Sequence, residues 1–177
     1  MPRKLIIITG SSGVGKTTLA RALQEELLPD QWLHFSIDSI FYCLPPSVVV
    51  RVDQHNDRTL VDSNAIVRAS HACTTTLLDL GHKIIFDSVI VTERGAHTML
   101  SRLGVFDPLL VELTCSWEVI RERTLARGDR TVAEAENGYR NATGHIKAHH
   151  TFDSTSTSAK ELAALLAAKI RNGNRTD

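Results

Sequence analysis

The sequence predicts an α/β protein in which a doubly wound, five-stranded parallel sheet carries helices on both faces. Segments with the composition of buried strands alternate with segments of helical periodicity along the 177 residues. Such alternation is typical of parallel strands joined by right-handed crossover helices. A glycine-rich stretch follows the first expected strand, and an aspartate closes the second and the third. Because ligands bind at the carboxyl ends of the strands in such sheets, we expect the functional residues along one sheet edge.

The five expected strands are short and rich in Ile, Leu, Val and Phe. Residues 4–9 form an unbroken apolar run, and residues 32–37 alternate partly between apolar and polar side chains. Residues 83–87 and 108–114 have the composition of further buried strands, and residues 151–153 are a short fifth candidate. Runs of this length and composition indicate strands of a sheet that is covered on both faces.

The helices between these strands are indicated by their periodicity and their end signals. In the first helix Leu19, Leu23 and Leu27 recur every four residues and share one face. Gly81 and Gly104 follow two later helices at the position where glycine commonly ends a helix. The expected helices are 17–28, 62–80, 92–103, 116–126, one that begins near 132 in the polar segment up to 150, and 159–170. Residues after 171 are expected to fray.

One segment, residues 41–56, has no clean period. Pro45 and Pro46 oppose a helix there, so residues 47–52 are expected to be a short strand or a loop on the substrate side. The length of the chain favours one domain over 1–177. We expect its acceptor side near 40–62.

Composition narrows the classes of partner. The chain has 20 Lys and Arg against 20 Asp and Glu, so the electrostatic argument for nucleic acid is missing. Three widely spaced cysteines, Cys43, Cys73 and Cys115, fit reduced thiols in the cytoplasm. No apolar run has the length of a membrane span, and the start of the chain has no signal-peptide pattern. We therefore expect a soluble cytoplasmic protein with neither nucleic acid nor membrane as a partner; the oligomeric state stays open.

The glycine-rich stretch carries the sharpest motif. It reads G-x-x-x-x-G-K-[ST] between an expected strand and an expected helix, which is the context of a phosphate-binding loop. The expected nucleotide-binding residues are Gly10, Ser11, Ser12, Gly13, Val14, Gly15, Lys16, Thr17 and Thr18. Lys16 can reach the β- and γ-phosphates, and the Thr17 hydroxyl can ligate Mg²⁺. Guanine-reading and protein-kinase signatures are missing from the sequence, so ATP is the expected nucleotide.

Two aspartates stand at expected strand ends beside this loop. Asp87 can hold Mg²⁺ near Thr17, directly or through water; the alternative is a turn or helix-capping aspartate. Asp38 can accept the proton of an attacking hydroxyl and aim that hydroxyl at the phosphate. For Asp38 the alternative is again a cap, here for the turn that follows.

An arginine cluster follows the fourth strand. Arg123, Arg127 and Arg130 are spaced four and three residues apart and share one face if helical geometry persists. Together they can stabilise charge on a transferred phosphoryl group. The alternative is a solvated helix end whose cations suit the helix dipole. The glycine at 128 breaks the helix within the cluster, which favours a lid near 123–148 in which Arg127 and Arg130 are catalytic and Arg127 also contacts the nucleotide.

These blocks together resemble the chloramphenicol phosphotransferase-like family. The blocks are 6–16 (IIITGSSGVGK), 32–39 (WLHFSIDS), 83–89 (KIIFDSV), 122–130, which ends in ARGDR, and 152–155 (FDST). They cover nearly the whole chain. The loop is common to a large superfamily, but its combination with the second and fourth blocks is much more specific.

The resemblance implies a nucleoside-monophosphate-kinase type of P-loop fold and transfer of the γ-phosphate of ATP to a small-molecule hydroxyl. It implies Asp38 as the general base, Lys16 as the phosphate-binding lysine, and Arg127 and Arg130 as lid arginines. An antibiotic-type alcohol as acceptor would mean a role in antibiotic resistance. The departures lie on the acceptor side, where Asp87 is followed by serine instead of a second aspartate and residues 42–62 do not align.

Two other readings stay open. One is a kinase of the shikimate, gluconate or nucleoside-monophosphate type. A nucleoside-monophosphate kinase needs further cations for the acceptor phosphate, and Arg51, Arg58 and Arg68 leave that possibility open. The other is a regulatory ATP-binding protein without an acceptor, which would predict slow hydrolysis and an unimportant Asp38.

Overall fold

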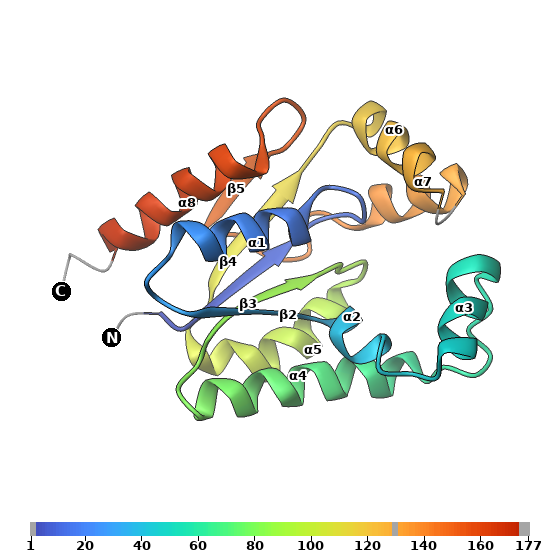
Figure 1. The fold of residues 1–177 in the computed structure, drawn as a ribbon, viewed down its shortest axis with the longest axis horizontal. Helices are drawn as coiled ribbons and strands as arrows, with labels where there is room; N and C mark the ends of the chain where they lie inside the picture. The colour runs from blue at the N-terminus through green and yellow to red at the C-terminus, as the bar shows by residue number, and fades with distance from the viewer. Residues whose placement is uncertain (1–2, 129–130, 174–177) are drawn as a thin grey trace.

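The computed structural model describes residues 3–128 and 131–173. Five parallel strands form one sheet in the order β2-β3-β1-β4-β5 (Figure 1). The strands are β1 Leu5–Thr9, β2 Trp32–Ser36, β3 Lys83–Ser88, β4 Leu109–Thr114 and β5 His150–Asp153. The five-stranded parallel sheet expected from the alternating pattern is therefore confirmed, and each strand begins and ends within two residues of its expected bounds.

Helices cover both faces of this sheet. They are α1 Lys16–Glu26, α2 Ile37–Phe41, α3 Pro46–His55, α4 Ser63–Asp79, α5 Glu93–Leu103, the short 3₁₀ helix η1 Gly104–Phe106, α6 Trp117–Arg127, α7 Val132–Asn141 and α8 Ala159–Gly173. In Figure 1, α1 and α8 lie on one side of the sheet and α4 and α5 on the other. This arrangement is the doubly wound α/β fold that the sequence predicts.

The central strand β1 explains why two separate cores form. Side chains alternate between the faces of a strand, and every residue of β1 is buried. Ile6 and Ile8 belong to the core under α1 and α8, whereas Leu5 and Ile7 belong to the core under α4 and α5. An unbroken apolar run is therefore what this position in a covered parallel sheet requires.

The strand register places three strand ends side by side. Thr9 at the end of β1 pairs with Ser88 of β3, and Ser36 at the end of β2 pairs with Asp87 of β3. The loop after β1, the start of α2 and the end of β3 therefore meet at one edge of the sheet. This is the edge on which the sequence places the candidate site.

The expectation for residues 47–52 is wrong. They lie in the helix α3, neither in a strand nor in a loop. Pro46 occupies the first helical position, where its missing N–H has no intrahelical partner and its fixed φ suits the helix. Val52 is buried, Val48 is half-buried one turn before it, and Asn56 ends the helix in a left-handed conformation. The proline pair starts this helix at Pro46.

α7 begins at Val132 as expected and ends at Asn141, and residues 142–149 are irregular. The end of the last helix differs from expectation. α8 continues to Gly173, through the residues expected to fray after 171. No helix in the described part of the chain is both long and apolar enough to span a bilayer.

Candidate active site

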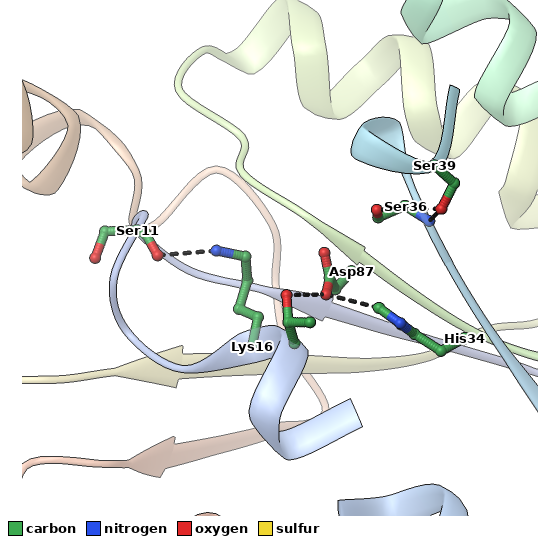
Figure 2. Close-up of polar contacts among 7 residues, drawn as sticks. Ser11, Lys16, His34, Ser36, Ser39 and Asp87 are labelled. Atoms are coloured by element: carbon green, nitrogen blue, oxygen red, sulfur yellow. Dashed lines mark hydrogen bonds and ion pairs between the residues drawn. The ribbon is translucent and has the colours of Figure 1, made fainter. Parts of the chain in front are cut away.

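The glycine-rich loop connects β1 to α1 and curls around the first residue of the helix. Gly15 caps α1 with φ of 101°, a left-handed conformation that suits glycine. The side chain of Lys16 is buried, and its Nζ donates a hydrogen bond to the carbonyl oxygen of Ser11 at 2.9 Å (Figure 2). The loop thus holds a cation and the N-terminus of an eleven-residue helix together, which is the arrangement that binds phosphate.

Two side chains hold this loop from outside. Arg123 on α6 donates from Nη1 to the carbonyl oxygens of Gly13 (3.2 Å) and Val14 (3.3 Å), and from Nη2 to that of Ser154 (3.2 Å). The hydroxyl of Ser154 donates to the same Val14 oxygen at 2.8 Å. In a trans peptide the C=O and N–H point in opposite directions, so a Val14 carbonyl held outward directs the N–H of Gly15 toward the inside of the loop.

Arg123 therefore differs from the role suggested by its spacing. The sequence groups it with Arg127 in a clamp on the phosphoryl group. The structure places its guanidinium on backbone carbonyls of the loop and of the segment after β5. Its direct contacts make it a support of the loop.

Asp87, at the end of β3, lies against the first turn of α1. Its Oδ2 atom accepts a hydrogen bond from the Thr17 hydroxyl at 2.8 Å and lies 2.8 Å from Nε2 of His34 (Figure 2). Burial, the largest single influence, raises the pKa of this carboxyl. The hydrogen bonds from His34 and Thr17, with the charges of His34 and Lys16, outweigh burial and lower the pKa below its usual value. Asp87 is therefore ionised at neutral pH although only 6% of it is exposed.

This pair of oxygen groups fits Mg²⁺. Hydroxyl and carboxylate oxygens are the ligands that Mg²⁺ prefers, and protein sites often supply only one or two carboxylates and leave the remaining positions to phosphate and water. The Thr17 hydroxyl donates its hydrogen bond to Asp87, which leaves the lone pairs of the hydroxyl oxygen for an ion. The residues expected to hold the metal are thus in contact, in agreement with their expected positions at the carboxyl ends of the strands.

Asp38 lies in the first turn of α2 and lines the same cleft as Lys16 and Asp87. The helix is started by a capping box in which the backbone N–H of Ser36 donates to Ser39 Oγ at 3.0 Å. Because Ser36 pairs with Asp87 across β2 and β3, this cap fixes where the turn carrying Asp38 leaves the sheet. The side chain of Asp38 is exposed.

The cleft itself is open and has a volume of about 1900 Å³. The loop residues 12–18 form its floor, α2, α3 and the start of α4 one wall, and the α6–α7 region the other. Arg127 lines this second wall, and Arg130 lies outside the described residues. Asn56, at the end of α3, donates to Glu134 on α7 at 2.8 Å and so joins the two walls.

Sequence reasoning missed three of these contacts. His34 reads as one polar residue in a strand, and only the strand register shows that it reaches Asp87. Asn56 is a helix-ending residue of a helix that was not expected. The bonds made by Arg123 depend on the fold of the whole chain. The sequence offered one signal for His34, which is a polar residue two positions before the end of an expected strand.

Comparison with known proteins shows the family of the chain. A family model described as chloramphenicol phosphotransferase-like protein matches residues 3–171. A protein of Mycobacterium tuberculosis (strain ATCC 25618 / H37Rv) named "Putative O-phosphotransferase" is 30% identical, with 90% of this chain and 79% of that protein covered. The chain belongs to the chloramphenicol phosphotransferase-like family. Membership makes it a protein of the kinase or phosphotransferase class with a nucleotide-binding P-loop.

Solved structures support the fold of this family member. Shikimate kinase from Acinetobacter baumannii, in complex with shikimate, superposes with a TM-score of 0.62 at 18% identity over 99% of this chain and 96% of that one. The APS kinase CysC of Mycobacterium tuberculosis, in complex with AMPPNP and APS, gives 0.68 at 14% identity over 97% and 99%. At these sequence identities the similarity concerns the fold alone. The structural neighbours of this fold are P-loop kinases, as the resemblance implies.

Proposed function

We propose that the protein transfers the γ-phosphate of ATP to a hydroxyl group of a small organic molecule, in the presence of Mg²⁺. The observation that carries this proposal is the shared cleft. The phosphate-binding loop with Lys16, the pair of Thr17 and Asp87 that could hold an ion, and the first turn of α2 with Asp38 all line it. A binding loop alone would suit a switch or a motor, but a carboxylate on a wall of the same cleft suits an incoming hydroxyl.

Three groups of residues in this cleft would bind the nucleotide. Backbone N–H groups of the loop and the N-terminus of α1 face the phosphates, and Lys16 adds a positive charge. Thr17 and Asp87 would hold Mg²⁺, which when bound neutralises charge on the β- and γ-phosphates. Arg127, on the far wall of the cleft, would contact the nucleotide and the transferred group when the α6–α7 region closes. The same role is proposed for Arg130.

Asp38 would bind the acceptor hydroxyl. The hydroxyl oxygen forms a bond to the γ-phosphorus, the bond from that phosphorus to the bridging oxygen of ADP breaks, and the hydroxyl proton passes to the Asp38 carboxylate. Because the transition state of phosphoryl transfer is loose, aiming the hydroxyl matters more than the basicity of the carboxylate. The exposed carboxylate of Asp38 is accessible to such an acceptor.

The acceptor half of the cleft combines apolar side chains with uncharged and acidic polar ones and holds one arginine. This half is formed by α2, α3, the residues up to the start of α4, and the segment after β3. Its apolar lining residues are Ile37, Phe41, Tyr42, Val52, Val61, Ile66, Val67, Val89 and Val91, and its polar ones include Asp53, Gln54, His55, Asn56 and Ser63. Arg58 is the only arginine or lysine among the described residues that line it. This composition favours a neutral alcohol with an apolar body, such as a hydroxylated antibiotic, over an acceptor that carries a phosphate.

An acceptor screen tests the proposal. Purified protein with ATP and Mg²⁺ is incubated with hydroxylated antibiotics, including chloramphenicol, and with shikimate, gluconate, sugars, nucleosides and nucleoside monophosphates. ADP release and the mass of the acceptor are measured together. We expect one class of neutral alcohol to gain a single phosphoryl group. ATP hydrolysis at the same slow rate with every compound would instead support a regulatory ATP-binding protein.

A further inference from the structure

His34 reaches the site from a strand that does not carry the phosphate-binding loop. It lies in the middle of the edge strand β2, paired with Ile85 of β3. Its side chain is mostly buried, with 16% exposed, and its ring turns toward the carboxyl end of the sheet, where Nε2 lies 2.8 Å from Asp87 Oδ2 (Figure 2). An ionised carboxylate only accepts hydrogen bonds, so His34 is the donor. A histidine that points along its strand to a buried aspartate is not explained by the packing of the sheet.

The two donors to Asp87 converge on one oxygen. Thr17 Oγ1 and His34 Nε2 both bond Oδ2, each at 2.8 Å. Among the described residues, no hydrogen bond reaches Oδ1. A carboxylate is planar, so two donors that bind the same oxygen restrict the rotation of the group. Figure 2 shows the second oxygen of Asp87 directed away from His34.

We propose that His34 is a positioning residue, which orients the Asp87 carboxylate so that Oδ1 faces the magnesium–nucleotide site. This inference rests on the proposed function. Thr17 alone cannot fix the carboxylate, because its hydroxyl rotates and is itself an expected ligand of the ion. His34 donates from a ring carried by strand β2, a different element from α1, which carries Thr17. Partners of this kind typically contribute 10- to 100-fold to metal affinity.

Two substitutions separate orientation from packing. His34→Leu keeps an apolar body in the strand and removes the donor. His34→Gln keeps an N–H donor at a similar reach. His97→Leu, on the exposed surface of α5, makes the same chemical change away from the site and serves as the control. If His34→Leu does not fold, His34→Asn, whose amide is too short to reach Asp87, replaces it.

The experiment measures ATP binding by calorimetry, first with EDTA and then over a series of Mg²⁺ concentrations. In EDTA we expect every variant to bind ATP within about twofold of the wild type. With Mg²⁺ we expect His34→Leu to need roughly tenfold more of the ion for half of the full gain in ATP affinity. We expect His34→Gln to recover most of that loss and His97→Leu to match the wild type.

Three outcomes would overturn the inference. They are an unchanged Mg²⁺ requirement in His34→Leu, equal losses in the Leu and Gln variants, and a loss of ATP affinity that is as large in EDTA as in Mg²⁺. Each would assign His34 to packing or to the loop. Because binding is the readout, a failed acceptor screen would refute phosphoryl transfer without changing this result. An altered Mg²⁺ requirement would likewise stand without any identified acceptor.

Discussion

Arg123 provides the strongest prediction about the loop. The substitution Arg123→Leu removes three hydrogen bonds of 3.2–3.3 Å that join α6 to Gly13, Val14 and Ser154. A bond from a charged donor contributes about 1.5–3 kcal/mol. The side chain is half-buried, so water can replace part of each bond, and the Val14 oxygen keeps the hydroxyl of Ser154. We therefore expect a total loss of about 2–4 kcal/mol in the free energy of unfolding.

The assay is urea unfolding of the wild type and the variant, combined with ATP binding under native conditions. Arg121→Leu is the matched control, since Arg121 is exposed on the same helix and its loss should change stability by less than about 0.5 kcal/mol. ATP affinity should fall for Arg123→Leu, because the N–H groups of a looser loop are no longer held toward the phosphates. Equal stability of the two variants, with unchanged ATP affinity for Arg123→Leu, would refute the role of Arg123 as a loop support.

Two further predictions concern a glycine and a histidine. Gly10 has a φ of 143°, and a Cβ built on it would lie 2.2 Å from the carbonyl oxygen of Leu113. Gly10→Ala should therefore lower the free energy of unfolding by about 3 kcal/mol or more. The control Gly138→Ala, in a helix with no atom within 4 Å of the new Cβ, should stabilise by roughly 0.5–1 kcal/mol, and similar thermal midpoints for both variants would contradict the clash. Burial, followed by the charge of Arg102, lowers the pKa of His71 below its ordinary 6.5. Below pH 6.5 the His71 side chain is therefore protonated in the unfolded chain but stays neutral in the native state. The free energy of unfolding should then fall as the pH drops below 6.5, by at most about 1.4 kcal/mol per pH unit. His71→Leu should flatten urea unfolding midpoints between pH 7.5 and 5.5, whereas curves parallel to the wild type would show that His71 plays no part.

The sequence was most informative where one local signal decides the structure. The apolar run of β1, the glycines of the loop and the aspartate after β3 each imply a position at the carboxyl edge of a parallel sheet. From that rule alone Thr17 and Asp87 were expected to be neighbours, and they lie in hydrogen-bond contact. The chain order of strands and helices fixed these positions without any knowledge of side-chain packing.

The sequence was least informative where several readings share one pattern. Pro46 can end a helix or begin one, and only the buried Val52 and the left-handed Asn56 reveal the helix α3. The contact of His34 depends on the register between β2 and β3, which the sequence does not determine. Arg123 has a helical spacing to Arg127 that suits a clamp, but its partners are backbone carbonyls from two distant segments. Such contacts follow from the assembled fold.

The central claim is that Asp38 receives and aims an acceptor hydroxyl in the cleft that binds ATP. The most direct measurement is single-turnover transfer of the γ-phosphate to the best acceptor by the Asp38→Asn variant, alongside its ATP affinity. The amide keeps the size of the side chain, but without the negative charge it holds the acceptor hydroxyl more weakly and cannot take up its proton. We predict that transfer slows by about 100-fold or more while the dissociation constant for ATP stays within about threefold of the wild type. Transfer at a near-normal rate would contradict the role of Asp38 and with it the proposed mechanism.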